Sequence, residues 1–168
     1  MPDTLAPSVA DVVELTRALV RCESVTPVEA GALQLLERTL TEIGFRCERM
    51  DFTQAGTDDV ANLYARIGSG GKHFCFAGHS DVVPVGDLSS WTIGPFAAEL
   101  SAGYLFGRGA ADMKLDGTMA IASLIELKRQ GFRPRRDIVI EFSGDEETRM
   151  KTSALIAEQL SNAELVLN

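Results

Sequence analysis

Three apolar, strand-like runs, each followed directly by acidic or histidine-bearing residues, limit most strongly what this chain can fold into. The segments that follow these runs are His79–Asp81, Gly107–Asp112 and Asp145–Glu147. In open α/β sheets, ligand-bearing loops gather at the carboxyl ends of the strands. One histidine and several carboxylates delivered from neighbouring strands are the ligand types of a zinc hydrolase site. We therefore expect His79, Asp112 and Glu147 to converge on one point that can hold divalent ions.

The spacing within these segments indicates a task for each side chain. His79 offers a ring nitrogen, and Asp81 lies on the same side of an extended segment, where it can accept a hydrogen bond from the imidazole. Asp112 follows a glycine-rich turn that lets the backbone approach an ion closely. Glu146 and Glu147 are adjacent, so an extended strand end would point one toward the metal and the other toward the water.

Each signal also has a purely structural interpretation. A single histidine after a strand is often a core residue, and Asp112 could cap the N-terminus of a helix. The acidic triplet Asp145–Glu147 could be a solvated turn. The order of the three segments, each after a core-like strand, favours the metal site.

The hydrophobic pattern predicts an α/β fold with a mixed central sheet flanked by helices. Helices are expected at 9–21, 29–43, 117–130 and 148–160, and strands at 45–52, 60–67, 73–77, 138–142 and 164–167. The short connection 68–72 predicts a hairpin of strands 60–67 and 73–77. The chain ends within a strand that we expect to be buried, so residues 1–168 are interpreted as one part of a longer domain.

Composition limits the choice of partner and compartment. The net charge of −8 argues against nucleic acid or an anionic membrane as the main partner. No apolar run approaches the roughly 20 residues that span a bilayer, and the N-terminus has no signal-peptide pattern. Cys22, Cys47 and Cys75 form no Cys-x-x-Cys motif, which favours reduced thiols and a cytoplasmic protein.

Two other classes of function are alternatives to the metal site. The first alternative is a nucleotide-binding module. Its dinucleotide fingerprint has a third glycine or alanine at the position where the segment Gly107–Asp112 has aspartate, so the fingerprint is not matched. The segment Gly70–His73 lacks the upstream glycine and the serine or threonine of a P-loop. A folded fragment or interaction module without catalytic activity is the other alternative.

Three motifs in this order resemble the M20 metallopeptidase family: His-x-Asp at 79–81, Gly-Arg-Gly-x-x-Asp-Met-Lys at 107–114 and Gly-Asp-Glu-Glu at 144–147. The resemblance covers essentially the whole chain. Up to about Lys114 the chain looks most like the succinyl-diaminopimelate desuccinylase branch, on the stretches 21–27, 62–66, 76–84 and 107–114. Residues 115–118 and 148–153 look more like general peptidases of the family.

The resemblance implies a zinc-peptidase-like catalytic domain that hydrolyses the amide bond of an N-acyl amino acid or small peptide, with N-succinyl-diaminopimelate as one such substrate. Two Zn²⁺ ions are implied, with Co²⁺ or Mn²⁺ as alternatives. By this resemblance His79 binds one ion, Asp112 bridges both and Glu147 binds the other. Glu146 is then the general base, and Asp81 orients His79.

The same resemblance sets expectations for the rest of the protein. Family members carry one more carboxylate ligand just beyond the last residue of this sequence, a late histidine, and a lid domain that pairs subunits as a homodimer. We expect residues 1–168 to hold three of five metal ligands and, as an isolated polypeptide, to be a weak or inactive catalyst.

Overall fold

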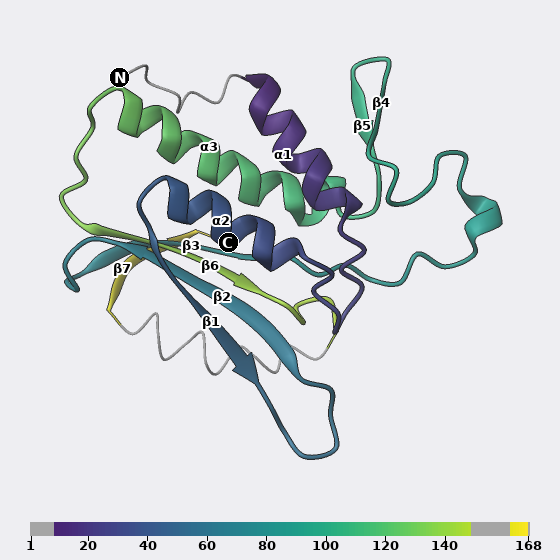
Figure 1. The fold of residues 1–168 in the computed structure, drawn as a ribbon, viewed down its shortest axis with the longest axis horizontal. Helices are drawn as coiled ribbons and strands as arrows, with labels where there is room; N and C mark the ends of the chain where they lie inside the picture. Colours follow the sequence, from purple (N-terminus) through teal and green to yellow (C-terminus); the bar gives the residue numbers. More distant parts are fainter. Residues whose placement is uncertain (1–8, 149–161, 168) are drawn as a thin grey trace. The chain divides into compact units, whose positions relative to one another are not determined.

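The computed structural model describes residues 9–148 and 162–167 (Figure 1). These residues divide into two compact units. The first unit contains residues 9–21 and 85–134, and the second contains residues 22–84, 135–148 and 162–167. No helix in the described ranges is long and apolar enough to cross a membrane. The fold class expected from the pattern, α/β with a mixed sheet, is confirmed.

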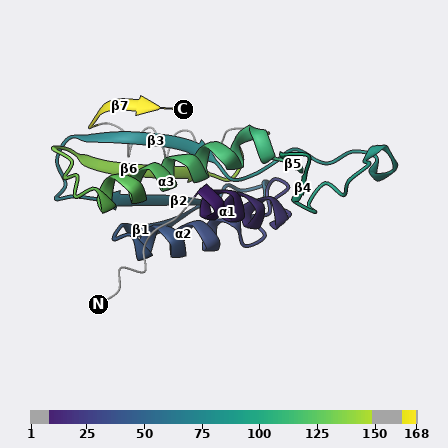
Figure 2. The same cartoon turned by 90° about the horizontal axis from the view of Figure 1, so that it is seen from above.

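A five-stranded mixed sheet in the order β1-β2-β6-β3-β7 forms the second unit. Its strands are β1 (Arg46–Phe52), β2 (Val60–Ile67), β3 (His73–His79), β6 (Asp137–Ser143) and β7 (Ala163–Leu167). The apolar strand β6 runs parallel to β3 and antiparallel to β2, and most of its side chains are buried. Helix α2 (Ala32–Glu42) packs on β1 and β2 (Figure 2). Its buried residues include Leu33, Leu36 and Leu40. A strand that is buried and paired on both sides needs the nearly continuous apolar run that β6 has.

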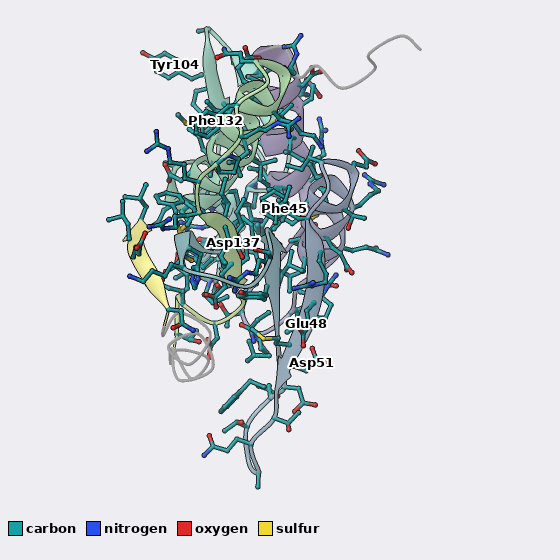
Figure 3. All side chains as sticks on the ribbon, turned by 90° about the vertical axis from the view of Figure 1, so that its left-hand side faces the viewer. Phe45, Glu48, Asp51, Tyr104, Phe132 and Asp137 are labelled. Carbon is teal, nitrogen blue, oxygen red and sulfur yellow. The ribbon has the colours of Figure 1, made fainter. Side chains whose placement is uncertain are left out.

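The expected hairpin of β2 and β3 is wrong, because β6 lies between these two strands. The connection after β2 passes over the start of β6, where the Asp137 carboxylate accepts hydrogen bonds from Ser69 N at 3.1 Å and Gly70 N at 2.7 Å. Arg66 at the end of β2 adds an ion pair of 2.7 Å to the same carboxylate (Asp137 is labelled in Figure 3). A Cβ on Gly68 would lie 2.0 Å from Asp137 Oδ1, so glycine is required there. Five loop residues therefore span two strand spacings, which a count of loop length alone does not reveal.

The first unit contains α1 (Val9–Arg21), α3 (Leu115–Arg129) and a small two-stranded sheet of β4 (Glu99–Ser101) and β5 (Tyr104–Phe106). A short 3₁₀ turn (Leu88–Ser90) and a π-type turn (Ala110–Lys114) complete it. The hydroxyls of Thr16 and Thr118 join α1 to α3 by a buried hydrogen bond of 2.6 Å. Tyr104 is 70% exposed and points away from the strand pair (Figure 3).

Most element boundaries lie within about two residues of the expected ranges. Helix α2 begins at Ala32 rather than at residue 29, because Gly31 adopts a left-handed φ of 85° that a helix cannot contain. The strand expected to be buried at 164–167 is instead the exposed edge strand β7, parallel to β3. Cys22, Cys47 and Cys75 are free thiols, as expected. The helix expected at 148–160 falls almost wholly outside the described residues.

Candidate metal centre

His79 and the acidic triplet follow adjacent parallel strands of the second unit. His79 is the last residue of β3 and stands opposite Ser143, the last residue of β6, in the strand register. Ser80 N extends this pairing by donating to Ser143 O at 2.9 Å. Parallel strands in register bring their carboxyl ends to the same edge of the sheet, so His79 and the segment after Ser143 lie together.

The imidazole of His79 is held in one orientation by the main chain. The ring is 5% exposed, and Nδ1 lies 3.0 Å from the carbonyl oxygen of Asp81. A carbonyl oxygen can only accept, so Nδ1 carries the proton and donates it, which leaves the lone pair on Nε2. The Asp81 carboxylate Oδ1 is farther from Nδ1, at 3.5 Å. The His79 ring therefore meets both the carbonyl and the carboxylate of Asp81, and the carbonyl oxygen is the nearer of the two.

The buried Asp81 carboxylate fixes the turn that carries the two glutamates. It accepts hydrogen bonds from Thr26 Oγ1 and, at 3.3 Å each, from the backbone N–H groups of Glu146 and Glu147. Burial raises the pKa of Asp81, but contact with the His79 ring and the hydrogen bonds from Thr26 and from Glu147 N–H outweigh it and lower the pKa. An ionised carboxylate at this place holds the glutamate backbones against His79.

Glu146 and Glu147 both approach His79. Glu146 Oε2 lies 3.7 Å from His79 Nε2, and one carboxylate oxygen of Glu147 lies within 4.8 Å of a ring nitrogen of His79. The expected extended strand end, with the two side chains pointing apart, is wrong. Residues 146–148 form a turn, closed by the hydrogen bond from Thr148 N to Asp145 O at 3.3 Å.

The donor set on this edge suits zinc. Two ligands of a tetrahedral zinc, at bond lengths of about 2.0–2.2 Å, lie roughly 3.3 Å apart. A ring nitrogen and a carboxylate oxygen within 4.8 Å reach that separation with small side-chain rotations. Imidazole and carboxylate are ligand types that zinc takes in hydrolase sites.

Asp112 belongs to the first unit and is exposed there. It lies in the π-type turn with φ −131° and ψ 103°, and its peptide bond to Met113 is cis. The interpretation of Asp112 as a helix cap is wrong, because α3 begins at Leu115 and has no side-chain cap hydrogen bond. The second apolar run, Tyr104–Phe106, pairs with β4 in the small sheet, so it is not a neighbour of β3 and β6 in the large one.

Thr26 is the residue of this site that the sequence motifs did not single out. It lies in the family-like stretch 21–27 and donates to Asp81, so it supports the glutamate turn from a distant part of the chain. The parallel bridge between Val25 and Val82 brings this stretch alongside Asp81. Its only sequence signal is the short polar Ser-Val-Thr-Pro segment, which carries no catalytic pattern by itself.

Comparison with known proteins gives consistent matches. Residues 75–166 match the pattern of Peptidase family M20/M25/M40. A succinyl-diaminopimelate desuccinylase of Parvibaculum lavamentivorans is 52% identical over 137 residues, which is 82% of this chain and 34% of that protein. The enzyme of that name from Bradyrhizobium diazoefficiens is 50% identical over 142 residues, covering 82% and 37%. This chain thus spans about a third of the length of these curated relatives.

A solved structure extends the comparison to the fold. Human carnosine dipeptidase 1 aligns with a TM-score of 0.77 at 22% identity, over 94% of this chain and 38% of that one. At this identity the likeness concerns the fold alone.

Proposed function

We propose that this chain, which belongs to peptidase family M20/M25/M40, carries the metal-binding and general-base residues of an amide-hydrolysing site. The observation that carries the proposal is the cluster in the second unit. There His79 Nε2 lies 3.7 Å from Glu146 Oε2, and a Glu147 carboxylate oxygen lies within 4.8 Å of a ring nitrogen of His79. A nitrogen donor, a carboxylate donor and a second carboxylate beside them are the groups that metal-assisted hydrolysis requires.

His79 and Glu147 would hold zinc, and Asp112 of the first unit is proposed as the ligand shared between two ions. Zinc in such a site supplies a Lewis acid that polarises the amide carbonyl and acidifies the attacking water. The protonated Nδ1 of His79, held by the Asp81 carbonyl, keeps Nε2 available as the ligand atom. Co²⁺ and Mn²⁺ accept the same nitrogen and oxygen donors.

Glu146 is proposed as the general base. Its side chain is 44% exposed, so it can reach a water molecule as well as the His79 ring. One carboxylate oxygen takes a proton from the attacking water, and the same carboxylic acid then donates that proton to the nitrogen of the departing amine. Asp81 holds the Glu146 and Glu147 amides in the turn that presents both carboxylates on one side.

The proposed substrate class is an N-acyl amino acid. The candidate within this class is N-succinyl-diaminopimelate, because the similar proteins are named succinyl-diaminopimelate desuccinylase. Such a substrate is a small molecule and needs neither nucleic acid nor a membrane. Because this chain spans about a third of those proteins, activity, subunit pairing and cytoplasmic location are proposals for the whole protein.

The test combines metal content with turnover. Zinc bound after dialysis is measured for the unchanged chain, His79→Ala and Glu146→Gln, with hydrolysis of N-succinyl amino acids followed in parallel. We expect His79→Ala to lose zinc, and Glu146→Gln to keep zinc while any turnover falls about 10² to 10⁴-fold. Glu48→Gln, an exposed glutamate on β1, is the matched control and should change neither quantity. Zinc retained by His79→Ala, or lost from Glu146→Gln, would contradict the assignment of roles.

A further inference from the structure

Strand β6 separates from one of its two neighbours just before the glutamate turn. Its antiparallel pairing with β2 ends at Phe142, whereas its parallel pairing with β3 continues to Ser143, opposite His79. The register would next bring Asn62 of β2 opposite Ser143, but in the described part of the chain Asn62 pairs with Met50 of β1 alone. The end of β6 therefore stays with the strand that carries His79 and leaves β2.

The carboxamide of Asn62 occupies the point where β6 leaves β2. Asn62 is completely buried, and its Oδ1 accepts a hydrogen bond from Gly144 N at 3.2 Å. Its Nδ2 donates to Met50 O at 2.9 Å and to Val60 O at 3.3 Å. An amide nitrogen donates and an amide oxygen accepts, so these three partners allow only one orientation of the side chain.

Gly144, the first residue after β6, lies directly against the backbone of β2. A Cβ on Gly144 would lie 2.4 Å from Ala61 O and 3.2 Å from Val60 Cγ1, so this close approach requires glycine. Gly144 is buried, and a buried N–H group without an acceptor is costly. The side chain of Asn62 supplies that acceptor where pairing with the main chain of β2 has stopped.

Two side chains from different parts of the sheet thus hold the backbone that carries the glutamates. Asn62 of β2 binds the N–H group of Gly144, and Asp81, which follows β3, binds the N–H groups of Glu146 and Glu147. Three of the four amides in residues 144–147 are fixed in this way. Because the turn is held from both sides, displacement of either anchor moves the two carboxylates relative to the imidazole at the end of β3.

We propose that Asn62 is a positioning residue of the hydrolytic site: its carboxamide ends the pairing of β6 with β2 and sets the place from which Glu146 and Glu147 reach the metal and the attacking water. The inference rests on the proposed function for the roles of the two glutamates. It gives a task to the first residue of the stretch 62–66. Asparagine suits this position because one side chain must accept from an N–H group and donate to two carbonyl oxygens.

The first test measures zinc affinity by chelator competition on chains that urea unfolding shows to be folded. Asn62→Ala removes the acceptor of Gly144 N–H and should weaken zinc binding about 10 to 100-fold, as loss of a group that orients metal ligands does. Asn62→Asp keeps an acceptor oxygen for Gly144 N–H and should retain most of the affinity, although it loses donors to the carbonyl oxygens of Met50 and Val60. If Asn62→Ala does not fold, Asn62→Ser, whose side chain is one bond shorter than that of asparagine, takes its place.

The matched control is Leu40→Ala, which removes a buried side chain of α2 in the same unit. It should lower stability without changing the zinc affinity of the folded chain. Amide hydrogen exchange of the metal-free chains then reports on the turn itself. The N–H groups of Gly144, Glu146 and Glu147 should exchange at least about tenfold faster in Asn62→Ala than in the unchanged chain, and at nearly the unchanged rate in Asn62→Asp.

The outcomes separate this inference from the proposed function. Equal zinc affinities of Asn62→Ala and Leu40→Ala, or equal losses in Asn62→Ala and Asn62→Asp, would overturn the positioning role. A chain whose zinc depends on His79 but not on Asn62 keeps the proposed function and loses the inference. If the unchanged chain binds no zinc, or His79→Ala binds it equally well, the proposed function is contradicted and amide exchange decides: unchanged exchange in Asn62→Ala overturns the role of Asn62, and faster exchange confined to the turn retains it.

Discussion

Replacing Glu141 with glutamine should make the protein more resistant to unfolding at alkaline pH. Glu141 is in the middle of β6, is completely buried, and neither of its carboxyl oxygens has a hydrogen-bond partner among the described residues. Burial raises the pKa of this carboxyl from 4.5 to about 7. The folded chain therefore keeps the proton between pH 4.5 and 7 while the unfolded chain releases it. Stability falls as pH rises through this window and levels off above it.

The magnitude follows from the difference between the two pKa values. At about 1.4 kcal/mol for each pKa unit, ionisation of Glu141 destabilises the fold by about 3 kcal/mol well above pH 7. Most of that penalty is absent at pH 5. Glu141→Gln never ionises, so its free energy of unfolding relative to the unchanged chain should rise by roughly 2 to 3 kcal/mol between pH 5 and pH 8. Any constant cost of a buried amide cancels in this difference.

The assay is urea unfolding at a series of pH values with EDTA present, so that bound metal does not contribute. The matched control is Glu48→Gln. Glu48 and Glu141 are both opposite Tyr64 in the sheet register, one on each side of it. Unlike Glu141, Glu48 is exposed (Figure 3). The control should change stability by less than about 0.5 kcal/mol across the series. If the free energy of unfolding of Glu141→Gln changed with pH in parallel with that of the unchanged chain, Glu141 would not be a buried carboxylic acid that keeps its proton in the folded state.

Three further variants or reagents test other parts of the structure. Gly68→Ala should lower the free energy of unfolding measured in urea by more than about 1 kcal/mol, because φ of Gly68 is 136° and the new Cβ would meet Asp137. Gly71→Ala is the control and should be tolerated, because a Cβ there meets no atom within 4 Å. Equal effects of the two substitutions would contradict the role of Gly68. Asp81→Asn should weaken zinc binding by about 10 to 100-fold in a chelator competition, because the carboxylate anchors the glutamate turn; unchanged affinity would remove that role. Burial raises the pKa of the Cys75 thiol to about 12, so iodoacetamide at pH 8 should modify Cys75 only after unfolding, as seen by mass spectrometry, and rapid native labelling would contradict its burial.

Strands and helices with a regular hydrophobic period could be predicted from the sequence, whereas the order of strands could not. The alternation in Val60–Ile67 and the apolar run in 138–142 give β2 and most of β6. β6 lies between β2 and β3, and Asp137 at its first residue accepts hydrogen bonds from the loop amides of Ser69 and Gly70. Those contacts join residues nearly 70 positions apart, and no local pattern carries them.

The candidate site also combines residues that the local sequence predicts with contacts between distant residues that it does not predict. His79, Glu146 and Glu147 could be selected because their residue types follow core strands, and β3 and β6 prove to be parallel neighbours. The roles of Thr26 and of the Asp81 carboxylate were not predictable in detail, because they depend on a turn that replaces the expected strand extension. Asp112 was selected by its glycine-rich context, and it lies in the turn Ala110–Lys114 that follows β5, a strand of the smaller sheet.

X-ray absorption at the zinc edge tests the proposed centre most directly, because it reports which atom types surround the ion. The chain contains two histidines, His73 and His79, and three cysteines that could compete as ligands. We predict one imidazole and carboxylate or water oxygens at about 2.0–2.2 Å, without sulfur. The imidazole signal should disappear in His79→Ala and persist in His73→Gln. A zinc–sulfur distance of about 2.3 Å, or an imidazole signal that survives in His79→Ala, would contradict the metal centre proposed for this edge of the sheet.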